Sequence, residues 1–177
     1  MTDERKLNIG CANHKKEGYF NLDINPKFKP DIVHDANKKF PFKDNYFTEI
    51  VSFGTFDYLN DMYELIKEMY RILKPDGKLV FDVNHFKGRG SRSLRRSLRT
   101  YRIGDFYDFT GIQREYMNYD IRFSKVTCRI VLYKRFQFWN HIIERLINIS
   151  KRIQDIYETT GLSGLFPPSN IIVVMRK

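Results

Sequence analysis

The sequence has few cysteines and no long apolar run. Its 177 residues include only Cys11 and Cys128, which excludes a disulfide framework and favours a reducing compartment. No run approaches the roughly eighteen consecutive apolar residues of a membrane span, so we expect none. The first residues, Met-Thr-Asp-Glu-Arg-Lys, are charged and lack the apolar core of a signal peptide. We therefore expect a cytoplasmic protein.

Metal-ligand patterns and low-complexity composition are also missing. The four histidines and two cysteines show no metal-ligand spacing and no Cys-x-x-Cys pair, so we expect no metal. Ten glycines and six prolines are too few for a low-complexity chain. With 42% hydrophobic residues, the sequence predicts one domain over residues 1–177 with a sizeable core.

Acidic residues are absent from residues 87–102 (KGRGSRSLRRSLRTYR), which hold seven Lys and Arg and so carry much of the net charge of +10. If this segment is helical, four side chains at i, i+3, i+4 and i+7 share one face: Arg92, Arg95, Arg96 and Arg99. Such a stripe suits nucleic acid, a phosphorylated small molecule or an anionic membrane surface. A solvated basic face or lid is the alternative.

What is present in the first half is an alternation of strand and crossover signals. Short apolar or alternating runs predict strands at residues 6–11, 19–24, 31–34, 48–53 and 78–83. Apolar residues at helical spacing predict a helix over residues 61–73, with Asn60 or Asp61 as its N-cap. These apolar residues are Met62, Leu65, Ile66, Met69, Tyr70 and Leu73. This alternation predicts an α/β domain with a parallel sheet.

The second half has a different pattern. Residues 121–136 form a long β-rich run, and residues 171–175 predict a closing strand. Apolar spacing over residues 138–157 predicts one amphipathic helix that packs on the sheet or on a second copy. We therefore divide the domain into a cofactor-binding part (about 1–84), an acceptor-side part with the basic segment (about 85–120) and a carboxy-terminal part (about 121–177).

Three residues stand at the ends of successive predicted strands. Gly10 would let a ligand approach the backbone closely, because it has no side chain. Asp23 could accept hydrogen bonds from both hydroxyls of a ribose, and Asp35 could reach an adenine amino group. The alternative for all three is an ordinary turn. Together they indicate a cofactor that contains adenosine.

The spacing of these residues selects among such cofactors. A dinucleotide fingerprint needs G-x-G-x-x-G and an acid about twenty residues later. Here one glycine is followed by Asp23 after thirteen positions, and the chain has no G-x-x-x-x-G-K-[ST] phosphate loop. A cofactor without phosphates needs no helix N-terminus aimed at it. The short loop therefore favours S-adenosylmethionine over NAD.

Several stretches carry a family resemblance. They are LNIGCA with GYFNLDI, then DIVHDANKKFPFKDNYFTEIVS, LIKEMYRILKPDGKLVFDV and the tail YETTGLSGLFPPSNIIVVMRK. The chain resembles the class I S-adenosylmethionine-dependent methyltransferases, in particular a compact, methyltransferase type 11-like branch. The resemblance covers about two-thirds of the chain. It implies a Rossmann-like, mostly parallel seven-stranded sheet with helices on both faces and an antiparallel last strand.

The resemblance also implies cofactor roles. Gly10, Cys11 and Ala12 would form the loop under the methionine and ribose, and Asp23 would hold the ribose hydroxyls. The remaining contacts would be made by Ile24 against the adenine, Asp35 and Ala36 at the adenine edge, and Phe53 near the sulfonium. The sequence departs from the family at Ala12, where a second glycine is usual, and at Tyr58, where a histidine is usual.

The acceptor side is less specific. Tyr58 and His85 follow predicted strands at the ligand edge, and with Arg92 and Arg96 they are the candidate acceptor contacts. No catalytic residue is assigned. We expect methyl transfer to an acceptor, with an anionic small molecule or nucleic acid favoured by the basic segment. The alternative is a non-catalytic module of the same fold that binds nucleic acid or another anionic partner through residues 87–102. The oligomeric state is not predicted.

Overall fold

The computed structural model describes residues 4–88, 99–111, 120–134 and 138–177. Its strands are β1 (Lys6–Ile9), β2 (Phe20–Asp23), β3 (Ile32–Val33), β4 (Phe47–Ser52), β5 (Leu73–Asn84), β6 (Lys125–Leu132) and β7 (Pro168–Arg176). Its α-helices are α1 (Met62–Ile72), α2 (Gly104–Tyr107), α3 (Asn140–Ile147), α4 (Lys151–Thr159) and α5 (Leu162–Leu165). Short 3₁₀ turns are η1 (Pro26–Phe28), η2 (Phe56–Tyr58) and η4 (Asp108–Thr110).

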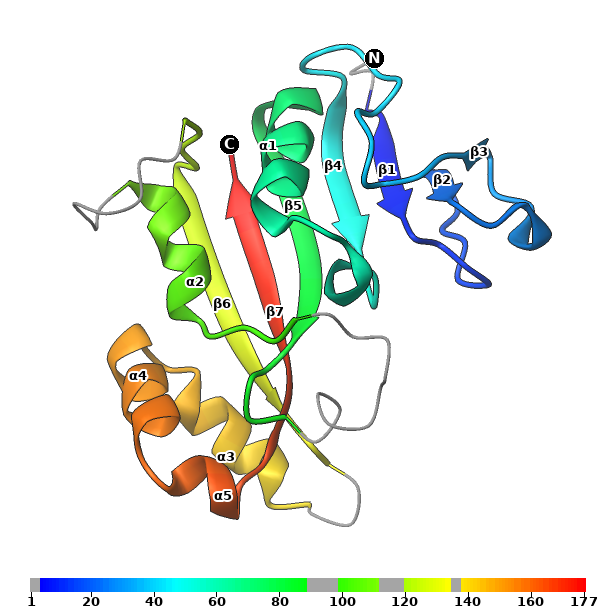
Figure 1. Cartoon of the computed structure of the whole chain (residues 1–177). Coiled ribbons are helices and arrows are strands. Elements are labelled where there is room, and N and C mark those ends of the chain that lie inside the picture. Colours follow the sequence, from blue (N-terminus) through cyan, green and yellow to red (C-terminus); the bar gives the residue numbers. More distant parts are fainter. Residues whose placement is uncertain (1–3, 89–98, 112–119, 135–137) are drawn as a thin grey trace.

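All seven strands form one sheet in the order β3-β2-β1-β4-β5-β7-β6 (Figure 1). Strands β1 to β5 pair in parallel, and β7 is antiparallel to both of its neighbours, β5 and β6. The predicted fold class, a mostly parallel α/β sheet with an antiparallel last strand, is therefore confirmed.

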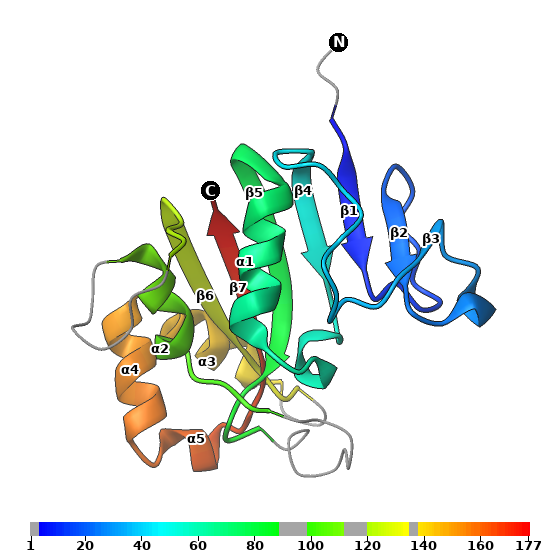
Figure 2. The same ribbon diagram turned by 45° about the horizontal axis from the view of Figure 1, so that its top comes forward.

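The helices are unevenly shared between the two faces of the sheet. The crossovers from β1 to β4 contain no α-helix, only the turn η1. In Figures 1 and 2, α1 and α2 lie over the same face. On β5, the residues toward that face (Leu79, Phe81, Val83) are fully buried, whereas the alternate residues are only partly buried.

Helix α1 forms as its sequence predicts. The carboxylate of Asp61 accepts hydrogen bonds from the backbone N–H groups of Tyr63 (2.9 Å) and Glu64 (3.2 Å), as an N-cap does. Its apolar face is buried against the sheet, with Ile66 and Met69 fully inaccessible. The helix passes directly into β5, so this strand begins earlier than the predicted residue 78.

The prediction of a single helix over residues 138–157 is wrong, because the chain breaks between α3 and α4. At the break, Ser150 is extended (φ −152°, ψ 157°), and its hydroxyl accepts a hydrogen bond from the backbone of Ile153 at 3.3 Å. The side-chain amide of Asn148 pairs with β6 instead, donating to the carbonyl of Ile130 and accepting from its N–H, both at 2.8 Å. This pairing takes the place of a neighbouring strand.

Other polar side chains continue this protection of the outer edge of β6. Glu144 accepts a hydrogen bond from the backbone of Leu132 at 3.0 Å, and Gln154 donates to the carbonyl of Cys128 at 2.7 Å. An uncovered strand edge offers unpaired N–H and C=O groups to other chains, so these side chains close it. Helices α3 and α4 therefore turn polar residues toward the sheet.

Candidate cofactor-binding site

A cavity of about 310 Å³ lies at the carboxyl ends of β1, β2 and β4, the expected ligand edge of a parallel sheet. The predicted residues among those lining it are Gly10, Ala12, Asp23, Ile24, Asp35, Ala36 and Tyr58. Its other lining residues are Ile9, Leu22, His34, Asn37, Gly54, Thr55 and Leu59. The fold thus brings together residues that are separated by up to 50 positions.

Gly10 is required by the geometry of this edge. Its φ is +70°, in the region that favours glycine, and its N–H donates to the carbonyl of Leu22 at 2.8 Å. A Cβ atom on Gly10 would lie 1.9 Å from Oγ1 of Thr55. The loop after β1 therefore approaches the loop after β4 more closely than any side chain allows.

Asp23 holds the loop after β1 in place. One carboxylate oxygen accepts a hydrogen bond from the backbone of Ala12 at 2.9 Å, and the other accepts from Asn25 at 2.8 Å. The residue is buried. Each carboxylate oxygen can accept a further hydrogen bond, because it has two lone pairs. Ala12 itself has φ +40°, which explains why glycine suits this position in the resembled family.

Asp35 combines a turn with a position on the cavity wall. Its carboxylate accepts hydrogen bonds at 3.0 Å from both the backbone and the side-chain amide of Asn37. The backbone N–H of Asn37 is the main cause that lowers the pKa of Asp35, so the group is ionised at neutral pH. The turn and the ligand contact are thus compatible.

The charge of the lining narrows the ligand class. Two carboxylates, Asp23 and Asp35, face this cavity, and no Lys or Arg is found among its described lining residues. This lining disfavours a pyrophosphate and suits a cofactor that carries no phosphate and bears a positive charge. Elsewhere in the described parts of the chain, no group of three or more His, Cys, Asp or Glu side chains could hold a metal ion.

Two predicted cofactor contacts do not line the cavity. Cys11 is buried with 2% of its surface exposed, and burial is the main cause that raises the pKa of its thiol, so it is a packing residue. Phe53 is 43% exposed, and the ammonium of Lys16 lies 5.5 Å from its ring centre. The cofactor roles of both residues stay predictions.

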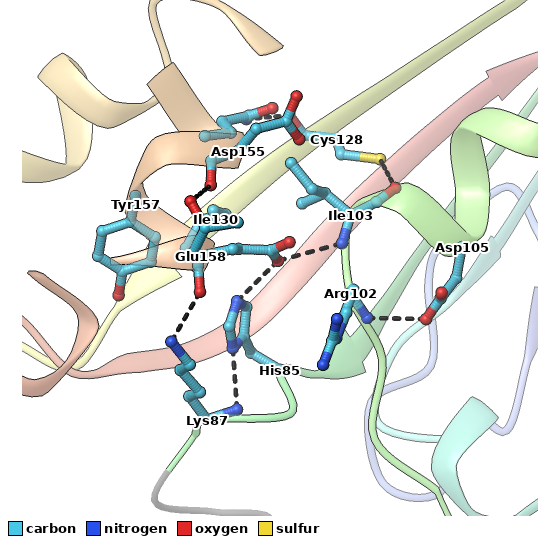
Figure 3. Close-up of polar contacts among 12 residues, drawn as sticks. His85, Lys87, Arg102, Ile103, Asp105, Cys128, Ile130, Asp155, Tyr157 and Glu158 are labelled. Atoms are coloured by element: carbon cyan, nitrogen blue, oxygen red, sulfur yellow. Dashed lines mark hydrogen bonds and ion pairs between the residues drawn. The ribbon is translucent and has the colours of Figure 1, made fainter. Parts of the chain in front are cut away.

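His85 is not the accessible acceptor contact that the sequence predicts, because its side chain is fully buried. Its Nε2 lies 2.9 Å from the carboxylate of Glu158, which also accepts the backbone N–H of Ile103 at 3.1 Å (Figure 3). The backbone of Lys87 donates to Nδ1 at 3.1 Å, so the hydrogen of the neutral ring is on Nε2. His85 therefore has a structural role, joining the chain after β5 to α4.

The basic segment starts and ends at one place. The N–H of Phe86 donates to the carbonyl of Tyr101 and the N–H of Tyr101 to the carbonyl of Asn84, both at 3.0 Å. Beyond this pair, the guanidinium of Arg99 donates to the carbonyl of Asn60 at 2.6 Å. Asn60 follows Leu59, which lines the cavity. The carboxy-terminal end of the segment thus reaches the cavity rim.

The other predicted arginines, Arg92, Arg95 and Arg96, lie outside the described residues. Their role as acceptor contacts therefore stays a prediction. The one arginine of the expected stripe that the structure describes is Arg99, which lies beside the cavity rim.

Sequence reasoning missed the carboxylates behind the cavity. Asp82 on β5 accepts hydrogen bonds from the backbone of Gly54 (2.6 Å) and the side chain of Asn170 (2.9 Å), and so fixes the loop after β4. Asp57 is buried, accepts the N–H of Asn84 at 3.0 Å, and has its pKa raised to about 6, mainly by burial. An acid within the apolar run KLVFDV was the available signal.

Comparison with known proteins agrees with this geometry. Residues 8–81 match a protein-family model described as a methyltransferase domain. The structure is similar to a crystal structure of an S-adenosylmethionine-dependent methyltransferase from Archaeoglobus fulgidus, with TM-score 0.65 and 17% sequence identity. The similarity covers 98% of this chain and 86% of the other. The chain has the S-adenosylmethionine-dependent methyltransferase fold. The predicted family resemblance is thereby confirmed.

Other similar proteins differ in what their names describe. One is phosphoethanolamine N-methyltransferase 2 from Haemonchus contortus, solved with S-adenosyl-L-methionine, with TM-score 0.57 and 16% sequence identity. The similarity covers 98% of this chain and 48% of that enzyme's chain. The human mitochondrial arginine-hydroxylase NDUFAF5 is 31% identical over 56% of this chain. The chain spans about a third (34%) of that relative's length. The expected cytoplasmic location stays a prediction.

Proposed function

We propose that the chain binds S-adenosylmethionine in the strand-end cavity and transfers its methyl group to an anionic acceptor. The observation that carries this proposal is the cavity itself. It lies at the carboxyl ends of β1, β2 and β4, is lined by two carboxylates, and requires glycine at residue 10. The match of residues 8–81 to a methyltransferase domain supports the same reading.

Different residues of the cavity would contact different parts of the cofactor. Asp23 accepts ribose hydroxyls with the lone pairs that its backbone contacts leave. Ile24, which is 61% exposed at the cavity wall, offers an apolar surface to the adenine beside Ala36. Gly10 keeps the backbone close enough to contact the methionine portion.

S-adenosylmethionine held by Gly10, Asp23 and Ile24 would supply an electrophilic methyl group to a lone pair of the acceptor, and the electrons of the broken carbon–sulfur bond would stay on the departing S-adenosylhomocysteine. The sulfonium is already electrophilic, so the protein contributes mainly orientation and exclusion of water. A general base is needed only if the acceptor atom carries a proton of high pKa. Tyr58, 41% exposed on the cavity wall, is the described side chain placed to contact the acceptor.

An anionic acceptor is favoured by the charge at the rim. Arg99 reaches Asn60 beside the cavity, and the segment that leads to it carries seven Lys and Arg and no acid between residues 87 and 102. A guanidinium binds phosphate or carboxylate with paired hydrogen bonds. The Haemonchus contortus enzyme has been solved with phosphomonomethylethanolamine, a phosphate-bearing ligand.

Calorimetric titration with S-adenosylmethionine tests the cofactor step. We expect saturable binding to the wild-type protein, at least tenfold weaker binding for Asp23→Ala, and no binding of NAD. The matched control is Asp120→Ala, because Asp120 is an exposed acid paired with Lys67. Absence of heat at millimolar cofactor, with the protein folded, would refute the proposal.

Binding and transfer need separate tests, because one relative is named a hydroxylase. Incubation with methyl-labelled S-adenosylmethionine and panels of phosphorylated small molecules or oligonucleotides should move label to an anionic acceptor. Salt-sensitive oligonucleotide binding without transfer, lost when Arg92, Arg95, Arg96 and Arg99 are neutralised, would instead identify a non-catalytic nucleic-acid-binding module.

A further inference from the structure

Helix α3 presents an apolar stripe to solvent. Five large apolar side chains at helical spacing along and beside it are 43–76% exposed, and together they form the apolar stripe: Phe138, Trp139, Ile142, Leu146 and Ile149. Positions 139, 142 and 146 fall on one helix face. The rings of Phe138 and Trp139 contact each other with centroids 5.0 Å apart. Contiguous exposed apolar side chains of this size mark an interaction surface.

The exposure of the stripe follows from the way α3 packs. The face that α3 turns toward β6 carries Asn140 and Glu144, which are 0% and 2% exposed and bond to the strand edge. The same face also carries Ile147, which is buried, and Ile143, which packs against the core. Helix α3 thus meets the sheet with a mixed polar and apolar face, and its remaining apolar side chains point to solvent.

The charges around the stripe identify its partner. The exposed charged side chains of α3 and α4 are Arg145, Lys151 and Arg152, with one acid, Asp155. The acid within α3, Glu144, is buried and paired with Arg129 (2.6 Å) and Lys134 (3.0 Å). Aromatic and aliphatic side chains flanked by Lys and Arg are typical of helices that lie in the surface of an anionic bilayer.

We propose that the apolar stripe docks the protein on an anionic lipid surface, with the helix lying in the interfacial plane. A second copy of this chain is a poorer partner, because each copy carries a net charge of +10 and Arg145, on the same helix as the stripe, is exposed. Among the described residues no helix is long and apolar enough to cross a bilayer, so this contact is peripheral.

The position of the stripe relates it to the cavity. In Figures 1 and 2, α3, α4 and α5 gather at the end of β6 toward which β1 and β4 also run. That end is the one at which the cavity lies. The stripe lies beside the β6 edge, whereas the cavity lies at β1, β2 and β4, so the two share an end of the sheet but not an edge. The docking inference does not depend on the proposed methyl transfer and is tested without it.

Trp139 is the only tryptophan of the chain, so it reports on the stripe directly. Vesicles of phosphatidylcholine and phosphatidylglycerol in equal parts should shift its emission to shorter wavelength and sediment with the protein. Vesicles of phosphatidylcholine alone should bind at least tenfold less. Raising the salt concentration should weaken binding, because the basic side chains contribute.

Substitutions separate the apolar from the electrostatic contribution. Ile142→Asp with Leu146→Asp should reduce the partition coefficient at least tenfold, and Arg145→Glu or Arg152→Glu about fivefold each. The matched control is Val33→Asp, because Val33 is 56% exposed on β3, at the opposite edge of the sheet. Circular dichroism should show the same fold for all variants.

Two results would overturn the proposal. One is the absence of sedimentation and of any emission shift with the anionic vesicles. The other is self-association without lipid. In that case the tryptophan emission would shift with protein concentration, and sedimentation velocity would show a dimer that Ile142→Asp dissociates. This result would assign the stripe to a second copy.

Discussion

Helices α1 and α3 both carry an apolar stripe, but that of α1 is buried and that of α3 is exposed. In α1 the stripe faces the sheet, and Ile66 and Met69 are fully buried. In α3 the stripe residues Ile142 and Leu146 are 63% and 50% exposed, while Glu144 is buried beside Ile147. Apolar periodicity therefore defines a helix face, but the surface that the helix meets decides which face is buried.

The difference lies in what each helix covers. Helix α1 lies over the face of the sheet, where the side chains of β5 are apolar. Helices α3 and α4 cover the outer edge of β6, where backbone N–H and C=O groups need partners. A buried backbone group without a hydrogen bond costs about 1–3 kcal/mol. Polar side chains that bond these groups are therefore favoured on the faces of α3 and α4 that cover the strand edge.

The largest expected effect comes from truncating one residue of each stripe. Ile66→Ala should lower the free energy of unfolding by roughly 3 kcal/mol, because it leaves a cavity in the core. Ile142→Ala should change it by less than about 0.5 kcal/mol, because the side chain is exposed. Urea denaturation of the two variants and the wild type measures both. Equal losses would show that α3 buries its stripe.

Buried carboxylates of the two regions respond to pH with opposite signs. Burial raises the pKa of Asp57 to about 6, so the folded state binds this proton more tightly than the unfolded state. Its contribution to the free energy of unfolding, roughly 2–3 kcal/mol, is therefore fully present below about pH 4 and is lost as the pH rises to about 6. Asp57→Asn should remove this part of the pH dependence of the free energy of unfolding, measured by urea titration at several pH values. An unchanged pH profile would contradict it.

Glu144 behaves in the opposite way. Burial alone would raise its pKa, but the N–H of Leu132 and the cations of Lys134 and Arg129 outweigh burial and lower it. Its contribution is therefore present above the usual glutamate pKa and lost as pH falls below it. Glu144→Ala should lower the free energy of unfolding at neutral pH by about 2 kcal/mol, and Glu144→Gln by less, because the amide retains an acceptor for Leu132. Equal values for both variants would argue against the edge-pairing role.

The smallest expected effect is at Ala12. Its φ of +40° is unfavourable for alanine and free for glycine, while glycine adds entropy to the unfolded chain. Ala12→Gly should therefore raise the free energy of unfolding by less than about 1 kcal/mol, as measured by urea denaturation. A fall in the free energy of unfolding, in place of this rise, would mean that the methyl group of Ala12 contributes packing.

The sequence predicted the first half of the molecule well. Strand ends and the spacing from Gly10 to Asp23 located the cavity, because parallel strands place their carboxyl ends at one edge. Local patterns sufficed there. Cys11 and Phe53 do not line the cavity, because the direction of a side chain at a strand end depends on the turn that follows.

The second half was less predictable because its contacts are long-range. Asn140, Glu144 and Asn148 repeat every fourth residue, a polar stripe that was visible in the sequence, but its partner is the edge of β6. His85 was expected at an open edge and is covered by Glu158, 73 residues later. Such pairs cannot be read from spacing along the chain.

A crystal structure of the protein with S-adenosylhomocysteine tests the central claim most directly. We expect density in the strand-end cavity, with the ribose hydroxyls at hydrogen-bond distance from the carboxylate of Asp23 and the adenine beside Ile24 and Ala36. Density at another place, or an empty cavity at saturating ligand, would contradict the assignment of this cavity as the cofactor site.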